Sequence, residues 1–78
     1  MKSLFNCKMI KNVFLRVDSS PYELEITYLD DPSKTWIYRR HVADLAHKDY
    51  HKVAISDAYL AIKKALLTNE PFVEIELL

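Results

Sequence analysis

The sequence predicts an α+β fold, in which a small antiparallel sheet of three to four strands carries one main C-terminal helix on one face. Alternating apolar and polar residues indicate strands at 22–29, 35–40 and 72–77. A stretch with helical apolar spacing, 56–69, lies between the last two of these. The expected element order is β-β-β-(α)-α-β, in a single domain covering residues 1–78.

The strand expected at 22–29 has the clearest pattern, because four apolar side chains alternate with three polar ones. A hairpin loop at 30–34 should join it to the strand 35–40. An earlier strand is expected at 13–17, and the final strand should end near the C-terminus. Inward-facing residues are expected to be Val13, Leu15, Val17, Tyr22, Leu24, Ile26, Tyr28, Val73, Ile75 and Leu77.

Two regions leave alternatives open. Residues 1–12 fit either a short helix or the early part of a long first strand. Residues 41–52 have rough helical spacing, which favours a short helix that is either separate from the main one or continuous with it. The pattern does not fix the order of strands in the sheet, although the final strand could pair beside the first.

The main helix has a start signal and a stop signal. Ser56 can act as the N-cap, and Asp57 then places a negative charge in the first turn, where the helix dipole favours it. Asn69 can cap the C-terminus, and Pro71 prevents continuation. The face expected to cover the sheet consists of Ala58, Ala61, Ile62, Ala65 and Leu66, with Tyr59 at its margin.

A second apolar line runs along the other side of this helix. Leu60 and Leu67 are seven residues apart, and Val53 extends the line backwards by the same interval. Such a line needs a cover. Either another segment of the same chain covers it, or it forms a homodimer seam or a partner-binding surface.

Composition limits the classes of function. The formal net charge is zero, so nothing in the total charge favours nucleic acid or a membrane surface. Cys7 is the single cysteine, which excludes an intramolecular disulfide and fits a reducing compartment. No signal peptide or membrane-spanning run is evident, so the chain is expected to be cytoplasmic. The absence of glycine excludes glycine-rich phosphate loops, and no cofactor is expected.

Charge is nevertheless arranged in blocks along the chain. Glu23 and Glu25 could face Arg39 across neighbouring strands, which would be ordinary cross-strand pairing. If the final strand lies near the second, Glu74 and Glu76 would join them in one acidic patch. Such crowding favours a basic partner.

Catalytic and metal sites are weakly supported. Asp44, His47 and His51 have a spacing that zinc could use on a helix, but no fourth ligand lies nearby. Cys7 and His41 could in principle form a nucleophile and base, but no third group supports them. We therefore expect neither a metal site nor an enzyme.

Nucleic-acid binding is the main alternative to protein binding. Aromatic and basic residues interleave from Trp36 to His41, as they do on base-stacking strands. The phosphate-contacting set would be Lys34, Arg39, Arg40, Lys48 and Lys52.

The sequence favours a small non-enzymatic protein–protein interaction module over this alternative. Its expected contact residues are Glu23, Glu25, Glu74, Glu76, Leu60 and Leu67. In size and style the chain resembles the compact, motif-free α+β proteins with which phages and other mobile elements block host machinery, and this resemblance carries over no residue. It implies an inhibitor or modulator of a host complex.

Overall fold

The described part of the chain forms two small antiparallel sheets and one long helix. The computed structural model describes residues 2–31, 33–41 and 48–77. Within these ranges the elements are β1 (Lys2–Asn6), the 3₁₀ turn η1 (Cys7–Met9), β2 (Ile10–Arg16), β3 (Tyr22–Tyr28), β4 (Thr35–Arg40), α1 (Lys48–Leu67) and β5 (Phe72–Glu76). The predicted α+β class is confirmed.

The strands are divided between two sheets. One has the order β2-β3-β4, and the other pairs β1 with β5. The described residues therefore form five strands, where the sequence predicted three to four. The division arises at η1, where the Asn6 side chain accepts a hydrogen bond from the Lys8 N–H at 3.1 Å. This local bond interrupts the extended chain, so that β1 and β2 join different sheets.

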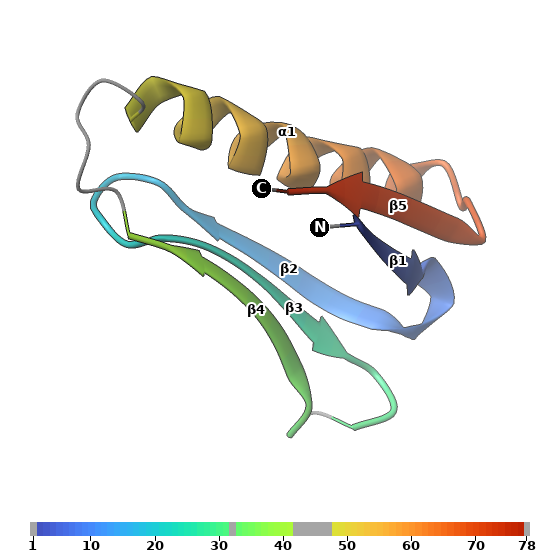
Figure 1. Ribbon diagram of the computed structural model, residues 1–78. Coiled ribbons are helices and arrows are strands. Elements are labelled where there is room, and N and C mark those ends of the chain that lie inside the picture. The colour runs from blue at the N-terminus through green and yellow to red at the C-terminus, as the bar shows by residue number, and fades with distance from the viewer. Residues whose placement is uncertain (1, 32, 42–47, 78) are drawn as a thin grey trace.

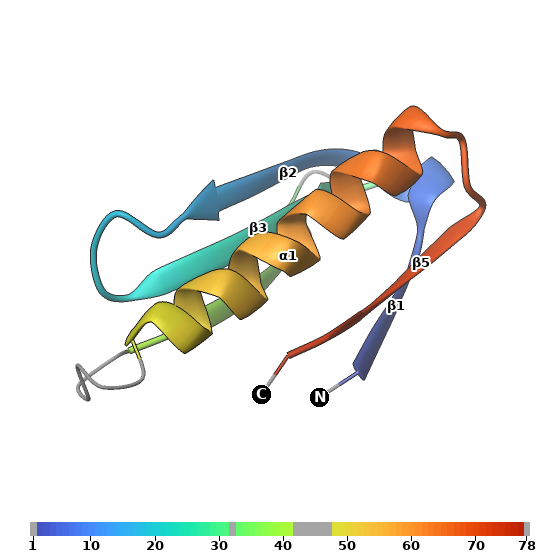
Figure 2. The same cartoon turned by 90° about the horizontal axis from the view of Figure 1, so that it is seen from above.

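The helix lies over both sheets (Figures 1 and 2). It packs against β2 and β3 on one flank and against β5 on the other. The η1 turn separates the β1–β5 ribbon from the larger sheet (Figure 1). The edge strands β1 and β4 are therefore not hydrogen-bonded to each other. The fold is therefore open on the side that faces away from α1.

The core lies between the helix and the inner faces of both sheets. The strand β3 supplies Tyr22, Leu24 and Ile26, each at most 1% exposed. The alternation predicted for β3 and β5 is confirmed, since Ile75 and Leu77 are also buried. The largest fully buried side chains of the described residues are Tyr22, Leu24, Ile26, Ile55, Ile62 and Leu77.

The helix begins earlier than the capping signal predicted. It starts at Lys48, so that Ser56 lies half-buried in its interior and is not an N-cap. The buried face of the helix extends to the residue before Ser56, because Ile55 is buried together with Ala58 and Ile62. Ala61 is exposed, contrary to prediction. Residues 48–52 thus belong to the main helix, and residues 42–47 lie outside the described ones.

The C-terminal end of the helix is as predicted. Asn69 has a φ of 56°, in the left-handed region that asparagine tolerates better than most residues. The Glu70 N–H donates to the Ala65 carbonyl at 3.0 Å, and the Asn69 N–H donates to the Leu66 carbonyl at 3.4 Å. These two bonds form a Schellman motif, which turns the chain directly into β5.

Candidate functional site: an apolar cleft between the two sheets

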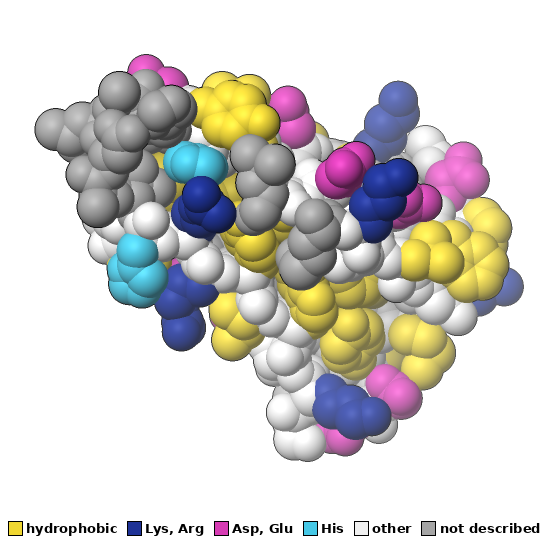
Figure 3. Space-filling model, in the orientation of Figure 1, with side chains coloured by type: hydrophobic (Ala, Val, Ile, Leu, Met, Phe, Trp, Pro, Cys, Tyr) yellow, Lys and Arg dark blue, Asp and Glu magenta, His cyan; other side chains and the backbone are white. Residues whose placement is uncertain are grey.

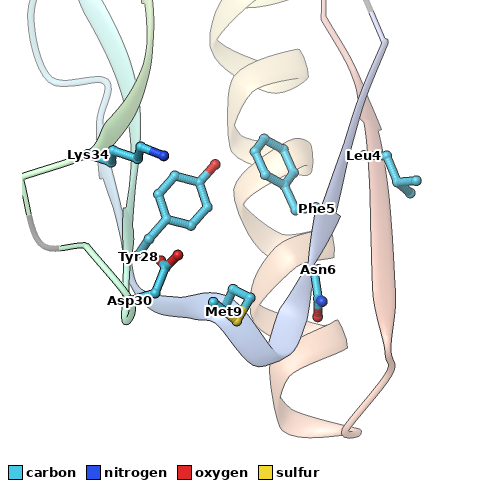
Figure 4. Close-up of a pocket in the computed structure, with 7 residues that line it drawn as sticks. All are labelled: Leu4, Phe5, Asn6, Met9, Tyr28, Asp30 and Lys34. Carbon is cyan, nitrogen blue, oxygen red and sulfur yellow. The ribbon is translucent and has the colours of Figure 1, made fainter.

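The open side of the fold contains a cleft of about 390 Å³ between β1 and the end of β3. In the orientation of Figure 1, hydrophobic side chains form a band between β4 and the β1–β5 ribbon (Figure 3). The residues that line the cleft are Leu4, Phe5, Asn6, Met9, Tyr28, Asp30 and Lys34 (Figure 4). Its volume lies in the range typical of small-molecule or side-chain pockets, which is roughly 300–1,000 Å³.

One wall of the cleft comes from β1 and η1. Phe5 is only 5% exposed, and its ring meets that of Trp36 edge-on, with the ring centroids 5.1 Å apart. The turn that carries Met9 is tied to the chain before β5, because the Cys7 N–H donates to the Pro71 carbonyl at 3.0 Å. The Phe5–Trp36 contact therefore connects the two sheets directly and fixes the position of this wall.

The opposite wall comes from the end of β3 and the loop that follows it. Tyr28 pairs with Ile10 in the sheet. The loop is shaped by Asp31, whose side chain accepts bonds from the Ser33 N–H at 3.1 Å and from the Ser33 hydroxyl. The Lys34 N–H then donates to the Asp31 carbonyl at 2.9 Å. These bonds form a turn of the kind that aspartate favours, and the turn positions Lys34 at the rim.

The side chains in the cleft are mainly apolar, with polar groups at one edge. The rings of Phe5 and Tyr28 lie on opposite sides, and Met9 lies between them at the closed end (Figure 4). Lys34 extends from the β4 side toward the Tyr28 ring, whereas Leu4 points away from the cleft. Burial raises the pKa of the Tyr28 hydroxyl above its ordinary value of 10.0, and the nearby Asp30 carboxylate raises it further. That hydroxyl therefore remains protonated near neutral pH and can both donate and accept a hydrogen bond.

The four glutamates predicted as a partner surface do not form one patch. Glu23 and Glu25 lie on β3, whereas Glu74 and Glu76 lie on β5, which pairs with β1. The acidic crowding considered for a final strand near the second does not occur, because the two strands are in different sheets.

Cross-strand pairing explains Glu23 but not Glu25. The Arg39 Nε donates to the Glu23 carboxylate at 2.7 Å, and Arg16 lies 3.6 Å from the same oxygen. The hydrogen bond from Arg39 lowers the pKa of Glu23, with a further contribution from the charge of Arg16. Glu25 instead lies opposite Ile37 on one side and Phe14 on the other.

The helix stripe predicted from heptad spacing is exposed. Val53, Leu60 and Leu67 are 57%, 59% and 83% exposed, respectively. No segment of the described part of the chain covers this line, and β1 lies with the sheets beneath α1 (Figure 1).

The residues proposed to contact nucleic acid are spread over several surfaces. Arg39 and Arg40 lie on opposite faces of β4, and Arg39 is engaged with Glu23. Lys34 lies at the rim of the cleft, and Lys52 is exposed near the start of α1. The side chain of Lys48 lies outside the described part.

Cys7 and His41, considered as a nucleophile and a base, lie near opposite ends of the larger sheet. Cys7 lies beside the end where Ile10 pairs with Tyr28, whereas His41 follows the end where Arg40 pairs with Tyr22. Burial raises the pKa of the Cys7 thiol, which disfavours the reactive thiolate.

The metal ligands considered from the sequence fall mostly on residues that are not described. Asp44 and His47 lie outside the described ranges, and no group of metal-ligating side chains occurs within those ranges.

The cleft was not predicted from the sequence. Tyr28 was expected to face inward, and it does so at the edge of the core. Phe5 and Met9 were ambiguous because their strand could not be located. Asn6 is a partial signal, since an asparagine after an extended run can begin a turn, but it does not show which strand β1 pairs with.

Comparison with protein-family models, curated proteins and solved structures found no match to this chain. Among the described residues, no helix is both long and apolar enough to cross a membrane.

Proposed function

We propose that this chain is a small non-enzymatic protein–protein interaction module, of the kind that inhibits or modulates a larger complex. In this proposal the cleft receives an apolar side chain from an extended segment of the partner protein. The observation that supports it most directly is the concave surface formed by Phe5, Met9 and Tyr28, with Asp30 and Lys34 at its rim.

The lining favours a bulky apolar anchor such as leucine, methionine or phenylalanine. Aromatic rings and a methionine thioether offer polarisable contacts that adapt to the shape of the group they surround. Protein interfaces commonly concentrate their binding energy in a few such anchors that fill pockets on the partner. The Phe5–Trp36 contact holds the wall in place before binding, which reduces the entropic cost of association.

The rim favours polar residues on either side of the anchor. The Tyr28 hydroxyl can bond to a backbone carbonyl or amide of the bound segment. Asp30 and Lys34 carry opposite charges on the same loop, so they favour a partner segment with a basic and an acidic residue near its anchor.

The test is retention of a partner protein from the lysate of the native host on the immobilised chain. Met9→Trp should fill the cleft, and Met9→Lys should place a charge in it. Either variant should reduce retention about thirtyfold, as expected for the loss of one buried anchor. Far-UV circular dichroism and the urea midpoint establish that the variants are folded.

The matched control is Phe14→Trp, which makes a tryptophan at an exposed position on β2. Retention by this variant should equal that of the wild type. The proposal is wrong if both Met9 variants retain the partner fully, or if the chain retains only nucleic acid and loses it in an Arg39→Ala/Arg40→Ala variant.

A further inference from the structure

The exposed line on α1, here called the outer stripe, consists of Val53, Leu60 and Leu67. At about 100° per residue, this line is directly opposite the core residues Ala58 and Ile62. Figure 2 looks onto this side of the molecule and shows no other described element over the helix. The outer stripe therefore plays no part in the packing of the described chain against itself.

Charged residues flank the outer stripe unequally. Asp57 and Lys64 lie on one side of Leu60, and Lys63 lies with Ser56 on the other, as the same helical spacing requires. All three charged residues are exposed. A second helix laid along the stripe would meet these flanks, so the charge pattern determines which direction of approach is favourable.

We propose that the outer stripe binds the same stripe of a second copy of this chain, with the two helices antiparallel and a two-fold axis at Leu60. This inference does not depend on the proposed function of the cleft. Leu60 then packs against the partner's Leu60 on the axis. Val53 packs against the partner's Leu67, because each lies seven residues from the axis in opposite directions.

The antiparallel direction places opposite charges together. With a rise of about 1.5 Å per residue, Asp57 lies about 4.5 Å below Leu60 and Lys64 lies about 6 Å above it. The two-fold axis reverses the second helix and keeps the same flank on the same side. Asp57 therefore lies level with the partner's Lys64 to within about 1.5 Å, and the symmetry repeats this pair.

A parallel pair would place like charges together. Its two-fold axis runs along the helices, so that the flank with Lys64 would meet the flank with the partner's Lys63 at nearly the same height. Both side chains are positively charged, and their repulsion disfavours this arrangement. In the antiparallel arrangement the charges of the stripe complement those of an identical stripe. We therefore infer that the outer stripe binds a second copy of this chain.

The expected dimer is weak. Three apolar side chains from each chain make an interface smaller than the roughly 1,200 Å² at which stable complexes begin. We therefore expect dimerisation at micromolar concentrations, which sedimentation equilibrium can follow. The mass of the wild type should rise from 9.2 kDa toward twice that value as concentration increases.

Charge reversal tests the direction of the helices. Asp57→Lys should weaken dimerisation at least tenfold, because two lysines would then meet, and Lys64→Asp should do the same with two aspartates. The double variant Asp57→Lys/Lys64→Asp should restore dimerisation, since the opposite charges are exchanged. A parallel dimer, or a dimer through another surface, would not show this rescue.

Leu60→Ala should also weaken dimerisation at least tenfold, because Leu60 meets its own copy on the axis. The matched control is Leu29→Ala, which removes a leucine of similar exposure, 57% against 59%, from the end of β3. Circular dichroism checks that each variant is folded. A wild type of 9.2 kDa at every concentration, or a double charge variant that stays monomeric, would overturn the proposal.

Discussion

The cleft and the outer stripe are both apolar and both open, yet they arise in different ways. The cleft is concave and combines β1, η1, the end of β3 and the following loop, which are far apart in the sequence. The outer stripe is convex and belongs to one helix with heptad spacing. Part of the cleft is also part of the core, because Phe5 is buried, whereas every residue of the stripe is exposed.

This difference separates stability from binding. Changes to the cleft wall should weaken the folded state as well as binding of the proposed partner, because the wall connects the two sheets. Changes to the outer stripe should affect only association between chains. The two surfaces also suit different ligands, since a concave surface encloses a single side chain and a straight helical stripe matches another helix.

The largest effect is expected at the cleft wall. Phe5→Ala removes a buried ring and its contact with Trp36, and should lower the free energy of unfolding by about 3–5 kcal/mol. Trp36 is the single tryptophan, so its fluorescence during urea unfolding reports the change. A loss below about 1 kcal/mol would show that the two sheets are not joined through this contact.

A smaller effect is expected where the helix turns into β5, the strand that supports β1. Asn69→Ala should cost about 1 kcal/mol, because alanine tolerates the left-handed backbone of this position poorly. Asn69→Gly should be neutral or stabilising, since glycine adopts that region freely. Urea unfolding of both variants provides the comparison, and equal losses would contradict the capping role.

The pH dependence of the cleft should be smaller and confined to alkaline solution. The pKa of the Tyr28 hydroxyl is raised in the folded chain above its ordinary value of 10.0. Above that pH, the unfolded chain therefore loses the phenol proton more readily than the folded chain, and unfolding becomes more favourable. The contribution of this group to stability is fully present below that pH and is lost as pH rises through the folded pKa. The urea midpoint of the wild type should therefore fall relative to that of Tyr28→Phe as pH rises above about 10. Parallel curves would show that Tyr28 titrates as it does in the unfolded chain.

The smallest effect on stability is expected at the outer stripe. In dilute solution, where the chain is monomeric, Leu60→Ala should change the free energy of unfolding by no more than about 0.5 kcal/mol. The reason is that Leu60 is 59% exposed and lies opposite the core face. A large loss measured by dilute urea unfolding would mean that the stripe is covered within the chain itself.

The sequence predicted elements better than it predicted their assembly. The strand at 35–40 and the Asn69 cap are confirmed because alternation and capping depend on neighbouring residues. Ser56 was wrong as an N-cap because serine is also tolerated inside a helix whose face is held by a core. Ile55, just before Ser56, is buried in the core, so the helical core face already includes the residue at which the local signal predicted no helix.

The candidate site was harder to predict for the same reason. The stripe could be derived from spacing along one helix. The cleft requires knowing that β1 leaves the larger sheet at Asn6 and pairs with β5, which no short pattern encodes. A single acidic patch required the final strand to lie near the second, and this condition is not met because β5 pairs with β1 in a separate sheet.

The most direct test of the cleft as the partner site is an NMR titration of the ¹⁵N-labelled chain with the partner segment that it captures. The account predicts that the largest amide shifts occur at Asn6, Met9, Tyr28 and Lys34, with small changes at Leu60 and Leu67. Shifts centred on the outer stripe, or on the Glu25 face of the larger sheet, would contradict it.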